Sequence, residues 1–228
     1  MNKKIVLWDL DGTLIQINRF GIDKHAKSVE LATGLPIRGN PNSRGKTDRQ
    51  LITEHLDLYP TPLKMECINR SLEILDTLTT RELASTSLLS TKSALLAIRA
   101  VRDIGWENSI LTGNTPHRAK IKSISAGLWD EFSESDGFFG HLHTSRIELV
   151  QFAIETIRQT AQTHIVIIGD TPLDIESAHK CGVPVVAIST GDFSYQELQM
   201  HSPNLLIQDL DIGLMDLLDF LDTCSFIS

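Results

Sequence analysis

Short apolar runs alternate along the chain with longer segments of helical spacing. The run at residues 5–8 ends directly at Asp9, and an unbroken apolar run of this length is typical of a strand buried on both faces. Comparable runs lie at 109–111, 165–168, 183–188 and 205–207. Between these runs, apolar residues recur at steps of three and four, notably over 94–102 and 147–157. Strands that alternate with helices predict an α/β fold with a doubly wound, mostly parallel, Rossmann-like sheet.

Residues 16–89 interrupt this alternation. They contain no β-branched run, and helical spacing covers 22–33, 48–58 and 62–79 around a loop at 34–45 that is rich in Gly and Pro. We therefore expect an α-helical cap domain over residues 16–89, inserted into a Rossmann-like core formed by residues 1–15 and 90–228.

Two expected helix starts carry the pattern of a capping box, in which a hydroxyl residue and an acid or amide three positions later satisfy each other's backbone N–H groups. The pairs are Thr47 with Gln50 and Ser145 with Glu148. Gly105 is the expected end of the helix that begins near residue 94.

Acidic residues outnumber basic ones by 29 to 21, which gives a formal net charge of −8. Nucleic-acid binding needs a basic footprint, and anionic membranes attract basic segments, so neither partner is expected. An acidic protein that handles a phosphate must supply positive charge locally, from a few basic side chains or from a metal ion.

The cysteines are Cys67, Cys181 and Cys224, too few and too widely separated to predict a disulfide framework or a CxxC zinc site. No run of about 18 apolar residues is present, and the run at residues 5–8 is too short for a signal peptide. We expect a cytoplasmic protein, as a monomer or a homodimer. A leucine stripe predicts core packing rather than a dimer seam, at positions 214, 217, 218 and 221.

The segment Asp9-Leu10-Asp11-Gly12-Thr13 begins where the first predicted strand ends. Residues two apart in a strand share a face, so both carboxylates can face one point at the edge of the sheet where parallel α/β folds bind ligands. Two facing carboxylates repel each other unless a cation lies between them, and Mg²⁺ prefers oxygen ligands. The alternative is a pair of solvated loop aspartates.

Two further strand ends carry polar residues. Gly169-Asp170-Thr171-Pro172-Leu173-Asp174 follows the run at 165–168, and Thr112-Gly113-Asn114 follows the run at 109–111. The first segment suits a metal site. The alternative, which is compatible with a metal, is that Asp170 caps a helix and Asp174 complements its dipole. The second offers a hydroxyl and backbone amides to a phosphoryl oxygen. All three segments are predicted at one edge of one sheet.

In this order and spacing, the three segments resemble motifs one, two and four of the haloacid dehalogenase superfamily. The helical insertion after the first motif is similar to the type-one cap of phosphoglycolate phosphatase-like members. The resemblance covers essentially the whole chain. It implies a Mg²⁺-dependent phosphatase that acts on a small phosphorylated metabolite.

The resemblance also implies residue roles. Asp9 would be the nucleophile that forms an aspartyl-phosphate, and Asp11 the general acid and then the base that activates water. Mg²⁺ would be held by Asp9, the backbone carbonyl of Asp11, and Asp170, with Asp174 as a further ligand or a holder of metal-bound water. Thr112 would donate a hydrogen bond to the phosphoryl group, with the amides of Gly113 and Asn114 nearby.

The superfamily also uses a basic residue between the second and fourth motifs. Lys120 and Lys122 come early in the chain for this role, so we choose Arg146, which starts a predicted helix where a positive charge gains nothing from the helix dipole. This choice departs from the common Lys-Pro form of the motif.

Specificity is expected to come from the cap. Arg44, Lys46 and Arg49 place three basic residues in one loop, and Arg19 follows the first motif. These four side chains are candidates for binding a second anionic group of the substrate, such as a carboxylate or a phosphate.

Two other functions stay open at this stage. A phosphosugar mutase of the same superfamily keeps both aspartates of the first motif, and a non-catalytic regulatory protein could retain the fold. Dehalogenases and phosphonatases are disfavoured because they lack the second aspartate, which is present here as Asp11.

Overall fold

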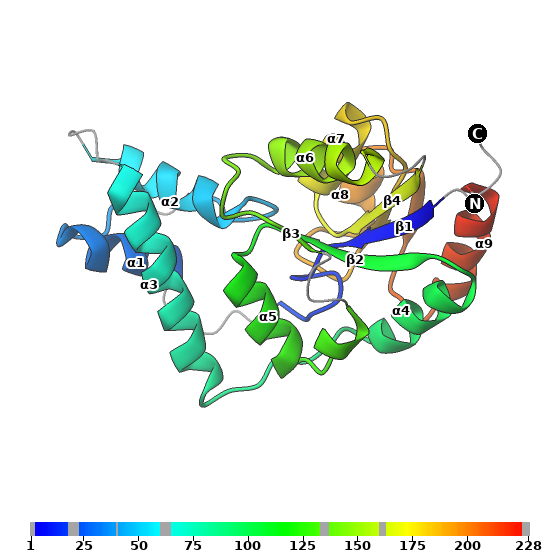
Figure 1. Ribbon diagram of the computed structural model, residues 1–228, viewed down its shortest axis with the longest axis horizontal. Helices are drawn as coiled ribbons and strands as arrows, with labels where there is room; N and C mark the ends of the chain where they lie inside the picture. Colours follow the sequence, from blue (N-terminus) through cyan, green and yellow to red (C-terminus); the bar gives the residue numbers. More distant parts are fainter. Residues whose placement is uncertain are drawn as a thin grey trace.

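The computed structural model describes residues 3–17, 23–39, 41–59, 65–132, 137–159 and 163–224. Within these residues the strands form one six-stranded, all-parallel sheet in the order β3-β2-β1-β4-β5-β6 (Figure 1). The strands are β1 (Lys3–Trp8), β2 (Glu107–Thr112), β3 (Gly137–Phe139), β4 (Thr163–Gly169), β5 (Val185–Ile188) and β6 (Leu205–Ile207). The predicted α/β class and parallel sheet are confirmed.

Helices cover both faces of this sheet (Figure 1). Val6 and Trp8 of β1 point to the face covered by α4 (Ala94–Asp103), α5 (Pro116–Ser125) and α9 (Leu214–Cys224). Ile5 and Leu7 point to the opposite face, which packs on α6 (Arg146–Arg158), α7 (Pro172–Lys180) and α8 (Tyr195–Gln199). Because β1 is buried on both faces, it reads as a continuous apolar run rather than an alternating one.

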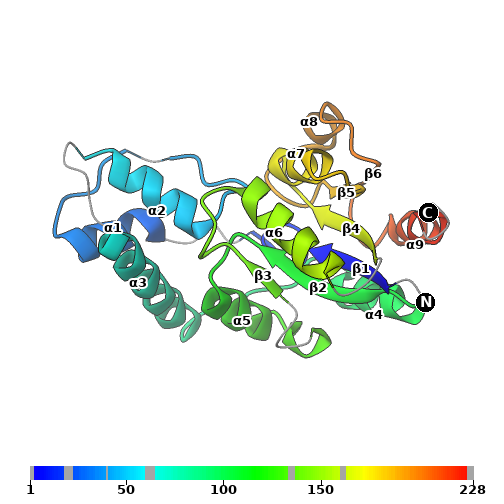
Figure 2. The same cartoon turned by 45° about the horizontal axis from the view of Figure 1, so that its top comes forward.

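Three helices lie beyond the carboxyl ends of the strands: α1 (Lys24–Thr33), α2 (Asp48–Asp57) and α3 (Met65–Leu83) (Figures 1 and 2). They bury a hydrophobic cluster of their own, which includes Val29, Ile52 and Leu75. The segments that lead into and out of these helices pair with each other, since Ile15 and Ser90 form an antiparallel bridge. The division into domains at residues 16 and 89 stays a prediction.

Several local predictions need correction. Strand β3 was missed, and β5 begins at Val185 rather than at residue 183. A short 3-10 turn, η1 (Trp129–Glu131), was also not predicted.

The two predicted capping boxes are only half formed. Thr47 and Ser145 accept from the backbone N–H three residues later, as expected. The Gln50 side chain instead donates to Glu54, and the Glu148 carboxylate accepts from Thr144, so neither returns a bond to its cap residue.

The leucine stripe of α9 packs as predicted. Leu217 and Leu221 are fully buried, and Leu214 and Leu218 are partly buried against the same cluster. Among the helices of the described residues, none is both long and apolar enough to cross a membrane.

Candidate active site

The chain turns sharply after β1 and separates apolar from polar side chains. Leu10 is fully buried, whereas Asp9 and Asp11 line a cavity of about 270 Å³ between the sheet edge and helices α1–α3. Gly12 adopts a left-handed φ of 92°, and a Cβ atom there would lie 2.2 Å from the carboxylate of Asp170. Glycine is therefore required at this position both by the backbone and by the close approach of the Asp170 side chain.

Asp170, directly after β4, is 1% exposed and accepts a hydrogen bond from the Thr13 hydroxyl at 3.0 Å. Burial raises the pKa of Asp170 well above its ordinary value, and the neighbouring Asp9 carboxylate raises it further. Burial likewise raises the pKa of Asp9 to about 8, against the opposing effect of Arg146. Two buried, mutually repelling carboxylates mark a place that favours a cation or protons.

Arg146 reaches this place from the first turn of α6. Its side chain is 2% exposed, and its guanidinium lies 3.2 Å from Asp9 and 2.7 Å from Asp174. It also donates to the carbonyl of Leu111 at 3.0 Å. The positive charge of Arg146 interacts unfavourably with the dipole at the start of α6, and its contacts with the two buried carboxylates compensate for this.

Asp174 also belongs to the start of α7. Its Oδ2 accepts from the Thr171 amide at 3.1 Å and from the Thr171 hydroxyl at 2.7 Å, and Thr171 in turn accepts from the Asp174 amide. This is a complete capping box with Thr171 as the cap. The alternative interpretation of Asp170 as the helix cap is therefore wrong.

The second strand end supplies partners for Asp11. The Asn114 amide side chain donates to Asp11 and to the Thr112 hydroxyl, both at 2.7 Å. Lys122 donates to Asp11 at 2.6 Å and to Asn114 at 2.9 Å. Burial acts to raise the pKa of Asp11, but Lys122 and Asn114 outweigh it, so the pKa of Asp11 lies below its ordinary value.

The expected contact of the Gly113 and Asn114 amides with a phosphoryl oxygen stays a prediction, but a structural contact is also made by the backbone of Gly113. Its carbonyl accepts from the Asp48 amide at 2.7 Å, and a Cβ atom on Gly113 would lie 2.3 Å from the Lys46 carbonyl. The Asn114 amide points at the Thr112 hydroxyl at 3.3 Å. The loop after β2 is therefore a docking surface for the loop that precedes α2.

The basic residues predicted in the cap loop have separate positions. Arg44 and Lys46 line the cavity, where Arg44 pairs with Asp192 at 3.1 Å and Lys46 with Glu54 at 2.7 Å. Arg49 is not among the residues that line it.

The Arg49 guanidinium instead donates to the His141 carbonyl at 3.1 Å, which ties α2 to the segment before α6. Arg19 lies outside the described residues.

Comparisons with known proteins bear on this arrangement. A family model described as HAD-hydrolase-like matches residues 146–212. A hydrolase from Pseudomonas syringae superposes with a TM-score of 0.67 at 17% identity, covering 99% of this chain and 100% of that chain. A putative beta-phosphoglucomutase from Bacteroides vulgatus gives 0.64 at 16% identity, covering 98% and 90%. A predicted phosphoglycolate phosphatase from Haemophilus somnus gives 0.59 at 17%, covering 96% and 97%. No curated protein matches the sequence.

The chain has the fold of the haloacid dehalogenase-like hydrolases. The fold that this resemblance implied is thus confirmed, and the part of the chain that matches the family model contains the segment 169–174. In this haloacid dehalogenase-like fold, the predicted residues Asp9, Asp11, Thr112 and Arg146 lie along one cavity, together with Asp170.

From the sequence, Lys122 was not chosen as the basic residue of the site because it follows β2 too soon. In the structure its side chain nevertheless contacts Asp11. Helical spacing could have found it: Thr115, Arg118 and Lys122 lie three and four residues apart, on one face of α5. Lys120 points elsewhere, and its Nζ lies 5.3 Å from the centre of the Trp129 ring.

Proposed function

We propose that this protein hydrolyses a small phosphomonoester in a Mg²⁺-dependent reaction that passes through an aspartyl-phosphate on Asp9. The observation that carries the proposal is that Asp9 and Asp11 follow the end of β1 and line one cavity, where each pairs with a basic side chain. Residues 16–89 act as the cap domain over a core of residues 1–15 and 90–228.

The chemistry of the donor set fits Mg²⁺. Among the described residues, no three His, Cys, Asp or Glu side chains converge as a ready-made metal site. Mg²⁺ keeps several waters and uses only one or two carboxylates, so Asp9, Asp170 and the backbone carbonyl of Asp11 suffice. Asp174, already paired with Arg146, would hold a metal-bound water rather than the ion. When bound, Mg²⁺ supplies charge neutralisation to the phosphoryl group.

The reaction uses the side chains in two steps. An oxygen of Asp9 attacks phosphorus, while Arg146 orients the carboxylate and the Thr112 hydroxyl donates to a phosphoryl oxygen. Asp11 gives a proton to the leaving alkoxide and then takes one from the water that cleaves the aspartyl-phosphate. Lys122 favours the ionised form of Asp11, which suits the second step; in the first step Asp11 must carry a proton.

The test is hydrolysis of p-nitrophenyl phosphate. With Mg²⁺ we expect turnover, and chelation by EDTA should lower the rate at least about 100-fold, because the ion contributes several kcal/mol to the barrier. Added Mg²⁺ should restore it. Equal rates with EDTA and with Mg²⁺ would contradict the role of the metal.

Thermal unfolding gives a second prediction that needs no turnover. Without metal, burial holds the pKa of Asp9 at about 8, far above the unfolded value of 3.8, so its contribution to stability is full below 3.8 and is lost as the pH rises toward 8. Bound Mg²⁺ requires ionised carboxylates and displaces these protons. The rise in Tm caused by Mg²⁺ should therefore be larger near pH 8 than near pH 6.

Asp170→Asn is the matched control for this measurement, because it removes one proposed ligand and leaves Asp9 in place. Its Tm should respond little to Mg²⁺ at either pH. A wild-type shift that is larger at the lower pH, or that persists in the variant, would argue against the assignment.

A phosphosugar mutase is the second candidate function. The similarity of the fold to a putative beta-phosphoglucomutase supports it. Product analysis separates the two: a phosphatase releases inorganic phosphate from a hexose 1-phosphate, whereas a mutase forms the 6-phosphate. A non-catalytic regulator would turn over neither, and the paired carboxylates would then have no chemical use.

A further inference from the structure

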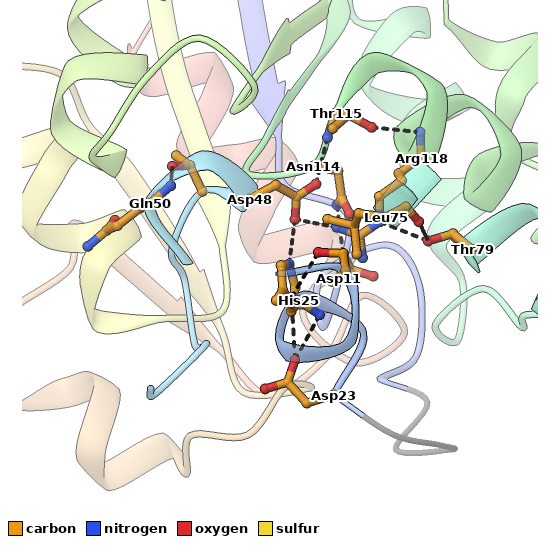
Figure 3. Close-up of polar contacts among 12 residues, drawn as sticks. Asp11, Asp23, His25, Asp48, Gln50, Leu75, Thr79, Asn114, Thr115 and Arg118 are labelled. Atoms are coloured by element: carbon orange, nitrogen blue, oxygen red, sulfur yellow. Dashed lines mark hydrogen bonds and ion pairs between the residues drawn. The ribbon is translucent and has the colours of Figure 1, made fainter. Parts of the chain in front are cut away.

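A buried polar cluster joins the cap helices to the core beside the proposed catalytic groups. Asp48, the first residue of α2, is 4% exposed and accepts from the Thr115 amide at 2.8 Å. Its other oxygen lies 2.9 Å from His25 and also pairs with Arg118. Figure 3 shows Asp48 between these three groups, with Asp11 close by. The cluster therefore draws on α1, α2 and the start of α5.

Arg118 belongs to the wall of the same cavity as Asp9 and Asp11. Its side chain is 7% exposed, and Nε donates to the Thr79 hydroxyl at 3.1 Å. A guanidinium in this position is well placed to bind a carboxylate or phosphate of a substrate. In this structure that capacity is taken up by Asp48.

The other lysines and arginines of the cavity that do not contact the proposed catalytic aspartates are paired as well. They are Lys24, Arg44 and Lys46, each with a carboxylate at 2.6 to 3.1 Å. These three pairs are partly exposed to solvent, with side-chain exposures of 19% to 44%. Solvated pairs open at little cost, because water replaces the lost partner.

The Asp48–Arg118 pair differs because both partners are buried. If Arg118 turned to a substrate anion, the buried Asp48 carboxylate would lose its guanidinium partner and keep only His25 and the Thr115 amide, which is costly. The inner wall of the cavity, formed by Asp48 and Arg118, therefore holds a neutralised pair of charges. At the outer rim, the ion pairs of Lys24, Arg44 and Lys46 can open to bind a substrate.

We propose that Asp48 is a specificity-determining residue: by neutralising Arg118 it makes the inner wall accept an uncharged, hydroxyl-bearing leaving group and disfavour one with a second negative charge. This inference rests on the proposed phosphatase function. It also modifies the expectation that the basic residues of the cap loop hold a second anion of the substrate.

Short phosphate esters in matched pairs test the proposal. Their carboxylate or hydroxymethyl group must lie close to the phosphoryl group, and therefore close to the inner wall. Two pairs differ only by a hydroxymethyl in place of a carboxylate: glycerol 3-phosphate with 3-phosphoglycerate, and 2-hydroxyethyl phosphate with phosphoglycolate. We expect wild-type kcat/KM to favour the uncharged ester of each pair at least about tenfold, since a carboxylate placed against a neutralised wall loses water without gaining an ionic partner, which costs several kcal/mol.

Two variants should change this preference in opposite directions. Asp48→Asn exposes the charge of Arg118, so the preference should fall at least about tenfold or reverse. Arg118→Gln leaves the Asp48 carboxylate facing the cavity, so the preference should rise. Glu131→Gln is the control, because Glu131 pairs with Arg99 and Arg102 away from the cavity and its change should leave the ratio unaltered. A loss of folding would lower both esters of a pair alike and would not move the ratio.

Binding of the same esters to the Asp9→Asn background, by calorimetry, gives the ratios without turnover. A wild-type preference for the carboxylate esters, or ratios that stay constant in both variants, would overturn the role of Asp48. If p-nitrophenyl phosphate is not hydrolysed while the binding ratios shift as expected, the proposed function fails and the assignment of Asp48 stands.

Discussion

Replacement of Asp9 by Asn should lower kcat for p-nitrophenyl phosphate by at least about 10⁴-fold, the scale seen when a nucleophile is removed from an enzyme. Asn matches Asp in shape but does not form the acyl-phosphate, because its remaining oxygen belongs to an uncharged amide and is a far weaker nucleophile than a carboxylate oxygen. The rate should be followed with saturating Mg²⁺ so that weakened metal binding does not limit turnover.

Two measurements separate loss of the nucleophile from loss of the fold. The Tm of Asp9→Asn without Mg²⁺ should not fall below that of the wild type, because burial opposes a charge at this position and Asn carries none. Beryllofluoride, which mimics an acyl-phosphate, should bind the wild type and not the variant. Residual activity within tenfold of the wild type would show that another group attacks phosphorus.

Replacement of Arg146 by Met should destabilise the protein by about 3–5 kcal/mol in urea denaturation, the range for a buried ion pair that loses one partner. Arg146 is 2% exposed and serves both Asp9 and Asp174, so its removal leaves two buried carboxylates without their cation. Since Arg146 opposes the rise in the pKa of Asp9, the pKa should climb further in the variant, and the stability loss should grow as the pH rises through about 8, where Asp9 ionises in the wild type and stays protonated in the variant.

Lys122→Met is the matched comparison. Lys122 also pairs with a catalytic aspartate, but the Asp11 side chain is 42% exposed, so water can replace the lysine and the loss should be at most about 1 kcal/mol. The double variant Arg146→Met/Asp174→Asn should recover part of the stability. Equal losses for the two single variants would contradict the difference in burial on which the prediction depends.

The sheet edge was predictable because its strands are buried on both faces and therefore read as unbroken apolar runs. Once β1, β2 and β4 are placed in parallel, the residues at or just after their carboxyl ends must meet at one edge, which is why Asp9, Thr112 and Asp170 come together. Strand β3 escaped because it has only three residues, Gly-Phe-Phe, without a β-branched side chain.

The polar contacts around the site were less predictable because each joins distant segments. Asp48 contacts Thr115 and Arg118 only because α2 docks on the loop that follows β2. That contact cannot be predicted from the spacing of residues in the sequence. The half-formed capping boxes show the same limitation, since Gln50 and Glu148 find competing partners in the folded chain.

The central position of β1 has a consequence for biosynthesis. Residue Ile5 pairs with Glu107 on one side and with Ile165 on the other, so β1 leaves the ribosome long before the two strands with which it pairs. Such long sequence separations slow folding and keep apolar surface exposed in the nascent chain. We expect Trp8 and its neighbours to remain unburied until β4 has been synthesised, so that the core does not form before that point.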